Sequence, residues 1–361
     1  MTMNASTDTD AARQVPVEFT GQAGEYFKIW LPNLLLTIVT LGVYSPWAKV
    51  RNTQYLYGHV RIDGASFAYT ADPLDILKGR ALALVLFLLY ILATEFAPAV
   101  ASVFIIAFFL LFPWLVVQAL RYRYRNTMYR NLRFDFAGRY PQAFVEYALM
   151  WLALIPTIGL AYPYIRWRQS RYVVANTRFG TSPFRFAAPV GSFYVIHLVP
   201  IGIVLLVLLI GGVLVATLTP LLAPLITGSQ EDGPPDFSLG LVVILILFIV
   251  VIYLAFVLVA IYMRARIRNL IFNNTTLAAH GFRSAVGVGA LVGLWITNTI
   301  ALICTLGLAW PWVRVRVARY YARCTTLNVV GDLDDFVARS SADSRAFGEE
   351  MGEVLGVDIG L

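Results

Sequence analysis

Charge is scarce in this chain. Charged residues make up 14% and apolar residues 59% of its 361 residues, whereas a soluble domain carries about 25% charged residues. The shortage excludes an ordinary soluble domain, because so little charge cannot cover a water-exposed surface. We therefore expect an integral membrane protein.

Cysteine and histidine are also rare. The two cysteines, Cys304 and Cys324, are too few for a disulfide framework or a four-cysteine metal site. The three histidines, His59, His197 and His280, lie in different segments and share no metal-binding spacing. We expect no bound metal and no cofactor.

Motifs of known chemistry are missing too. The chain has no glycine-rich phosphate loop, nucleophile elbow or zinc-protease pattern, so we expect no catalytic residues and no enzyme activity. The net charge of +7 comes mostly from arginines in short loops. Without a contiguous basic patch, we expect no nucleic-acid partner.

Residues 1–16 are polar and lack the apolar core of a signal peptide. We expect them to be disordered.

Long apolar runs take the place of these features. A bilayer is crossed by about 20 apolar residues, and runs near that length cover residues 26–44, 80–95, 99–119, 142–162, 193–226, 239–263 and 285–309. The turns at 95–98 and 228–236 hold no Lys or Arg, while every other loop does. Positively charged loops stay in the cytoplasm. We therefore expect those two turns outside and the other loops, with the C-terminus, inside.

One motif of sixteen residues occurs three times without a gap. It covers residues 40–55 (TLGVYSPWAKVRNTQY), 157–172 (TIGLAYPYIRWRQSRY) and 305–320 (TLGLAWPWVRVRVARY). Proline disfavours a helical residue before it and suits the first turn of a new helix. An apolar helix should therefore end near Tyr44, Tyr162 and Trp310, and a second helix should begin at the proline that follows.

In each second helix an arginine lies between aromatic residues four positions before and after it. The triplets are Trp47, Arg51 and Tyr55; Tyr164, Arg168 and Tyr172; and Trp312, Arg316 and Tyr320. Residues four apart share one helix stripe, which suits cation–π contact. A second base in each copy points toward water or lipid phosphate: Lys49, Arg166 and Arg314. We favour an interfacial anchor of aromatic and positive residues, and the alternative is a site for anionic lipid headgroups.

A second pattern lies in the cytoplasmic loops, where a polar residue precedes a phenylalanine by eight positions. The pairs are His59 and Phe67, Asn126 and Phe134, Asn176 and Phe184, and Asn274 and Phe282. Alternating apolar residues around these phenylalanines have the period of half-buried strands. Because an isolated hairpin is marginally stable, we expect strands of different repeats to pair in a layer under the membrane.

These patterns predict an all-α polytopic membrane protein with three pseudo-repeats and short cytoplasmic β-strands. The membrane domain covers residues 17–330, with repeats at about 17–125, 126–273 and 274–330. An acidic tail covers 331–361, and from Ser344 its apolar residues have helical spacing. We expect this tail helix to dock on the basic cytoplasmic layer of its own chain, with a partner protein, of unknown identity, as the alternative.

Three stretches relate the chain to a known family. They are Gly24-Glu25-Tyr26-Phe27-Lys28-Ile29-Trp30, the run Thr-Leu-Gly-Val-Tyr-Ser-Pro-Trp-Ala-Lys-Val-Arg at 40–51, and Arg268-Asn269-Leu270 with Asn273-Asn274-Thr275. Over about 17–330 the chain resembles the YjgN-like proteins of the bacterial inner membrane. The resemblance implies a multi-pass protein of the inner membrane and no established activity.

Two functional classes fit the sequence. The first is a transport or channel-like protein for a small solute or lipid, with Arg51, Arg168 and Arg316 at its inner mouth. The second is a scaffold that organises lipids or partner proteins. Three charged residues near the ends of apolar runs, Glu25, Lys28 and Glu146, are interpreted as side chains that reach the membrane surface.

The charge pattern also predicts that three segments do not span. If 26–44, 142–162 and 285–309 all crossed, alternate basic loops would face outward, against the positive-inside rule. We favour an arrangement in which these segments dip into the membrane and return, with seven full spans as the alternative.

Single cysteines introduced at Tyr140 and Ser170 in a cysteine-free background test this topology. We expect a membrane-impermeant thiol reagent added outside the cell to label neither position, because both loops stay in the cytoplasm. Labelling of one position alone would contradict the re-entrant arrangement.

Overall fold

Short strands close into an antiparallel barrel at the centre of the computed structural model, which describes residues 13–96, 98–226 and 239–342. Around the described barrel the order is β1-β10-β9-β8-β7-β6-β5-β4-β3-β2. The strands are β1 Arg13–Phe19, β2 Val60–Ile62, β3 Ala65–Tyr69, β4 Thr127–Tyr129, β5 Leu132–Phe136, β6 Thr177–Phe179, β7 Ser182–Phe186, β8 Thr275–Leu277, β9 His280–Ser284 and β10 Thr325–Val329.

This barrel corrects the all-α prediction. Strands of the expected repeats do pair, since β3 pairs with β4 and β7 with β8, and strands within one repeat pair as well, β5 with β6 and β9 with β10. The pairs do not stop at a small layer, however, because β1 joins β10 to β2 and closes the ring. Closure removes the exposed edges that such short strands would otherwise present.

Residues 13–16 were predicted to be disordered and instead form the first half of β1. Val15 lies opposite Leu327 of β10, and both side chains are buried. The strand was missed because it lacks the polar residue and phenylalanine of the other loops. Residues 1–12, the acidic turn at 228–236 and the tail helix expected from Ser344 lie outside the described residues.

The four hairpins of the barrel turn in two residues each. In the β2–β3 turn, Asp63 and Gly64 have φ values of 48° and 75°, and in the β4–β5 turn Arg130 and Asn131 have 47° and 60°. Positive φ at both central residues gives a turn whose twist matches that of the strands, so the turn type sets the register of these two hairpins. In the other two hairpins only the first central residue has a positive φ, 56° at Gly180 and 50° at Ala278.

One backbone hydrogen bond recurs at five joints around the ring. The residue after one strand donates to the residue before the next strand, at 2.8–3.0 Å. The donor and acceptor residues are Thr20 and His59, Thr70 and Asn126, Ala137 and Asn176, Ala187 and Asn274, and Ala285 and Cys324. At three of these joints an asparagine side chain also donates to the carbonyl four residues earlier. These bonds satisfy the carbonyls left free where a helix ends.

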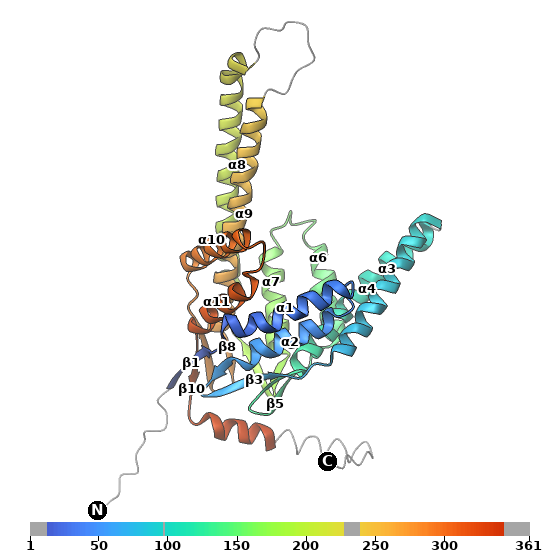
Figure 1. Ribbon diagram of the computed structural model, residues 1–361, viewed down its shortest axis with the longest axis vertical. Coiled ribbons are helices and arrows are strands. Elements are labelled where there is room, and N and C mark those ends of the chain that lie inside the picture. Colours follow the sequence, from blue (N-terminus) through green and yellow to red (C-terminus); the bar gives the residue numbers. More distant parts are fainter. Residues whose placement is uncertain (1–12, 97, 227–238, 343–361) are drawn as a thin grey trace, which may run out of the picture.

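The helices leave the barrel and return to it as hairpins. They are α1 Ala23–Val39, α2 Ser45–Gly58, α3 Pro73–Phe96, α4 Pro98–Arg125, α5 Tyr140–Phe144, the π-helix η1 Val145–Leu149, α6 Met150–Leu152, α7 Tyr162–Ala175, α8 Val190–Ile226, α9 Leu239–Asn273, α10 Val288–Cys304 and α11 Trp310–Arg323. Figure 1 shows the α3–α4 and α8–α9 hairpins rising from one side of the barrel and diverging.

Four of the described helices are long and apolar enough to cross a membrane, by length and composition: Pro73–Phe96, Ala99–Arg125, Val190–Leu214 and Ile246–Asn273. The three apolar segments that were predicted to dip into the membrane and return do not continue as long helices. Each turns back at its Thr-Leu-Gly or Thr-Ile-Gly motif, so α1–α2, α6–α7 and α10–α11 are short hairpins. Both ends of every hairpin therefore lie on the barrel side.

A helix at residues 333–342 covers the other end of the barrel. Its Leu333, Phe336 and Val337 share one buried cluster with inward-facing barrel residues such as Tyr129 and Phe179. The described barrel is thus filled by side chains and has a lid formed by the start of the acidic tail.

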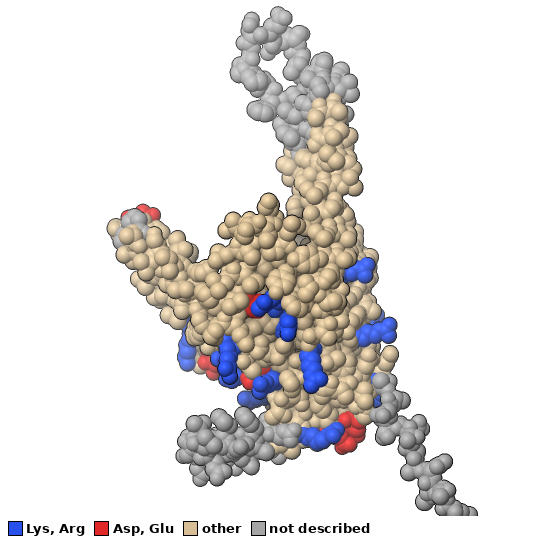
Figure 2. Space-filling model, turned by 180° about the vertical axis from the view of Figure 1, so that it is seen from behind, with Lys and Arg blue, Asp and Glu red and all other residues tan. Residues whose placement is uncertain are grey.

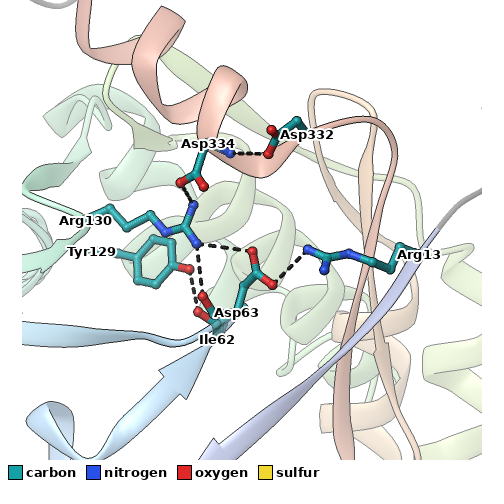
Figure 3. Close-up of polar contacts among 7 residues, drawn as sticks. All are labelled: Arg13, Ile62, Asp63, Tyr129, Arg130, Asp332 and Asp334. Atoms are coloured by element: carbon teal, nitrogen blue, oxygen red, sulfur yellow. Dashed lines mark hydrogen bonds and ion pairs between the residues drawn. The ribbon is translucent and has the colours of Figure 1, made fainter. Parts of the chain in front are cut away.

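An ionic network ties this helix to the strand ends (Figure 3). The Arg130 guanidinium donates to the carboxylates of Asp63, at 3.1 Å, and Asp334. Asp63 also accepts a 2.8 Å hydrogen bond from Arg13 of β1. The Tyr129 hydroxyl donates to the Ile62 carbonyl at 2.7 Å. Two hairpin turns, β1 and the lid helix meet at Arg130.

We predict that acid loosens the lid through His280. Burial, helped by the positive charge of Arg339, lowers the pKa of His280 below its ordinary value. Its Nδ1 accepts from the Val330 amide at 3.3 Å, and its ring lies 4.7 Å from that of Phe336. Because the folded state prefers neutral histidine, this contribution is complete above about pH 6.5 and is lost as the pH falls below that value.

Thermal unfolding between pH 7.5 and 5.5 measures the effect. We expect a loss of at most about 1.4 kcal/mol per pKa unit of the shift, and a smaller loss in His280→Gln. An equal slope in both proteins would contradict the prediction.

Candidate functional site

The three short hairpins share one backbone design. The tip residues Leu41, Ile158 and Leu306 have φ values near 50°, and the glycine after each has φ between 84° and 92°. The threonine of the motif accepts a hydrogen bond at its Oγ1 from the amide four residues later. The new helices begin at Ser45, Tyr162 and Trp310, one residue before the predicted prolines, with proline in the first turn. The apolar helices end earlier than predicted, at Val39, Leu152 and Cys304.

The tips expose apolar side chains. Leu41 is 95% exposed, Ile158 92% and Leu306 95%. Large apolar residues this exposed, on turns that strain the backbone of any residue with a Cβ, are unfavourable in water. Immersion of the tips in lipid would remove the cost of exposing these apolar side chains.

The tyrosine that ends each motif fixes the start of the apolar helix. The hydroxyls of Tyr55 and Tyr320 each bond both the amide and the carbonyl of the residue before α1 and α10, Gln22 and Gly287. Tyr172 donates to the carbonyl of Arg139, before α5, at 3.3 Å. In all three pairs the two residues are 33 apart in sequence.

This role replaces the predicted bracketing of each arginine by two rings. Burial, with Tyr147 nearby, raises the pKa of Tyr172 to about 12, so the hydroxyl stays protonated and can donate. Only the first ring of a triplet contacts its arginine: Tyr164 lies 5.9 Å from Arg168 and Trp312 lies 4.9 Å from Arg316, measured from guanidinium carbon to ring centre. Trp47 stacks on Tyr44 instead.

The three central arginines have different partners. Arg168 donates to both carboxylate oxygens of Glu146 at 2.6–3.0 Å. Arg316 donates to the Thr297 hydroxyl at 2.7 Å and to Asn298 Oδ1 at 3.2 Å. Arg51 has no hydrogen bond or ion pair within the described ranges. The structure therefore does not bring the three together in one site.

Glu146 corrects a sequence interpretation. We expected it to reach the membrane surface, but it is only 7% exposed and lies in the π-helix η1. A π-helix turn shifts the facing of the residues that follow, which brings this carboxylate against Arg168. Sequence periodicity assumes a regular helix and could not show this contact.

The three other predicted bases also separate. Arg166 donates to Gln169 at 3.0 Å and lines the central cavity. Arg314 lies over the ring of Trp310. Lys49 is exposed on α2. Of these three bases, only Arg166 lines this cavity, which the sequence did not predict.

The central cavity has a volume of about 410 Å³ and lies where the helices meet the barrel. The phenylalanines of the loop pattern, Phe134, Phe184 and Phe282, form one wall, and neighbouring rings stack at 6.4 and 5.9 Å. The remaining lining comes from α4, η1, α7, α9 and the first residues of β6 and β8: Tyr124, Tyr147, Arg166, Gln169, Ser170, Val173, Val174, Thr177, Ile271, Phe272 and Thr275.

This lining is mostly apolar, with one guanidinium and one amide at the side. Such a surface suits a molecule with an apolar body and a single anionic group. Figure 2 shows the basic side chains gathered over the barrel and the bases of the helices, while the described outer parts of the long hairpins are almost free of charge. An anionic molecule at the membrane surface is therefore drawn toward the barrel.

Comparison with known proteins gives a family and no activity. A family model described as "Bacterial protein of unknown function (DUF898)" matches residues 14–354. A protein of Salmonella typhimurium named "Inner membrane protein YjgN" is 26% identical over 365 residues, with 88% of each chain covered. A protein of the same name from Escherichia coli O157:H7 is 33% identical over 120 residues, which cover 33% of this chain and 30% of that protein. No solved structure matches.

We predict that Arg168→Ala destabilises the fold. The substitution leaves the buried Glu146 carboxylate without its partner, and breaking a buried ion pair costs about 3–5 kcal/mol. Because the Arg168 side chain is 33% exposed, we expect a loss of about 2 kcal/mol. The double variant Glu146→Met with Arg168→Met should recover most of it. Thermal unfolding in detergent measures both, and full stability of Arg168→Ala would contradict the structural role.

Proposed function

We propose that this chain, which belongs to the DUF898 family of bacterial proteins of unknown function, is an inner-membrane protein that binds a small anionic amphiphile in its central cavity. The named relatives are inner membrane proteins. The proposed ligand is a molecule with one acyl chain and one acidic group. Binding transfers this molecule from the bilayer into the cavity.

In this proposal the four long helices cross the membrane, and the barrel and C-terminus lie in the cytoplasm. The basic residues around the barrel support that orientation, since positive charge stays inside. The three short hairpins lie in the inner leaflet with their tips in the acyl chains. The cavity then lies near the cytoplasmic surface of the membrane, within reach of lipid.

The observation that carries the proposal is the lining of the cavity. Stacked phenylalanines offer an apolar surface for a chain, and Arg166 offers a charge for the acidic group. A volume of about 410 Å³ lies at the lower end of the range of small-molecule sites. It suits a single chain better than a whole phospholipid.

A solute channel through the barrel has less support. The inward-facing side chains of the described strands form one buried cluster with the lid helix, which leaves no polar lining for a hydrated solute. A scaffold without a ligand is the other candidate, and for it the cavity would be a packing defect. The two candidates differ in whether the cavity binds anything.

Filling the cavity tests the proposal. Ser170→Trp places an indole among the lining residues, so we expect binding of cis-parinaric acid, a fluorescent fatty acid, to weaken at least tenfold in an uncharged detergent. Thr53→Trp is the matched control, because Thr53 occupies the equivalent place on α2 and, like Ser170, donates to the carbonyl four residues earlier. It does not line the cavity.

A second variant tests the contribution of the Arg166 charge separately from that of the acyl chain. Arg166→Gln should weaken binding of the fatty acid about tenfold, the order expected for a charged hydrogen bond, and leave binding of its methyl ester unchanged. Wild-type affinity in Ser170→Trp would contradict the proposal and favour the scaffold.

A further inference from the structure

A separate pocket of about 440 Å³ lies between α1 and α2 of the first hairpin. Its lining consists of Lys28, Ile29, Pro32, Asn33, Arg51, Gln54 and Tyr55. None of these residues lines the central cavity. The pocket therefore needs its own account.

Two cations in this pocket have no counter-charge. Neither Lys28 nor Arg51 forms an ion pair or hydrogen bond with any residue that the structure describes, and both are exposed. The nearby acid Glu25 forms an ion pair with neither cation, and its carboxylate lies 3.1 Å from the Tyr55 hydroxyl and 4.0 Å from His59. Two free positive charges thus face one pocket.

The other two hairpins show what is particular to the first. At the position of Arg51 they have Arg168, neutralised by Glu146, and Arg316, hydrogen-bonded to Thr297 and Asn298. At the position of Lys28, six residues after the one before the apolar helix, they have valine and glycine. Of the three described hairpins, only the first has a cation at both positions, and neither cation is paired.

The polar wall behind the cations is fixed. Asn33 is 2% exposed and accepts a hydrogen bond from the Tyr44 hydroxyl at 3.3 Å, while its amide donates to Asn52 at 3.4 Å. Gln54 is held by a bond from its Nε2 to the Tyr69 carbonyl, at 3.3 Å. The pocket is therefore preorganised, which lowers the entropy cost of binding.

The pocket lies away from the hairpin tip. Arg51 is ten residues from the tip residue Leu41, and only residues 45–51 of that stretch are helical, about 9 Å along α2. When the tip lies in the acyl chains, the two cations are thus set back from it toward the barrel, around which the basic side chains gather.

We propose that the pocket between α1 and α2 binds a phosphate-bearing anion, with Lys28 and Arg51 as its ligands. An arginine and a lysine together supply the donors and the charge that a phosphate takes. The phosphate comes from an anionic phospholipid headgroup or from free phosphate in the cytoplasm. This site is independent of the amphiphile proposed for the central cavity.

Native mass spectrometry in an uncharged detergent tests the site. We expect phosphatidylglycerol to be retained by the wild-type protein, and its affinity to fall at least tenfold in the double variant Lys28→Gln with Arg51→Gln. Phosphatidylcholine should be retained weakly by both. Since neither side chain has a partner, thermal unfolding of the double variant should match the wild type.

Two controls make the result specific. Lys49→Gln removes an exposed cation from the same helix outside the pocket, and Arg316→Gln removes the equivalent of Arg51 in the third hairpin. Both should keep the wild-type affinity. If either loses as much as the double variant, or if the double variant loses nothing, the proposal is wrong.

Inorganic phosphate distinguishes the two sources. For a lipid site we expect phosphatidylglycerol to remain bound in millimolar phosphate. Displacement by millimolar phosphate in the wild type, with no phosphate binding in the double variant, would assign the same pocket to free phosphate.

Discussion

Closure of the barrel is the constraint on which the rest of this molecule depends. The described strands are three to seven residues long, too short for an isolated hairpin to be stable. They persist because β1 and β10, from opposite ends of the described chain, pair with each other and leave no edge. Every helical segment must therefore begin and end on the ring. For that reason all the apolar excursions leave from one side and return to it, and the basic loops gather there.

Two small devices then orient the short hairpins. A tyrosine hydroxyl ties the second helix to the start of the first, and a left-handed residue followed by glycine turns the chain at the tip. With both ends fixed, the depth and direction of each tip follow from the barrel. The same framework leaves the interior of the hairpins free to differ, and the arginine partners show this difference. Glu146 neutralises one copy, neutral side chains bond another, and the first copy keeps its charges free.

Much of this architecture could be predicted from the sequence, and the predictions that failed did so for physical reasons. The helix breaks before Pro46, Pro163 and Pro311 followed from proline geometry, and the pattern of Asn126 and Phe134 correctly indicated short strands in separate loops that pair with one another. The all-α prediction failed because a three-residue strand is too short to show a period, and because β1 carries none of the marks of the other loops. A closed ring is also a property of the whole chain, which no local pattern shows.

The candidate sites were harder to predict. The wall of the central cavity joins residues as distant as Phe134 and Phe282, whose common spacing was noticed although their meeting point could not be foreseen. The contact between Glu146 and Arg168 depends on a π-helix that regular periodicity excludes. Lys28 was set aside because one charge near a helix end is usual, and only the fold places it beside Arg51.

The pairing of β1 with β10 is the most direct test of this account. Cysteines replacing Gln14 and Asn328, which lie opposite each other in the register, should be cross-linked by a short thiol reagent in intact membranes of a cysteine-free protein. Glu18 paired with Asn328 should not be, because four residues along the strand place them about 13 Å apart. Efficient cross-linking of the first pair alone is the result that a closed barrel predicts. Absence of that cross-link, or equal cross-linking of both pairs, would contradict it.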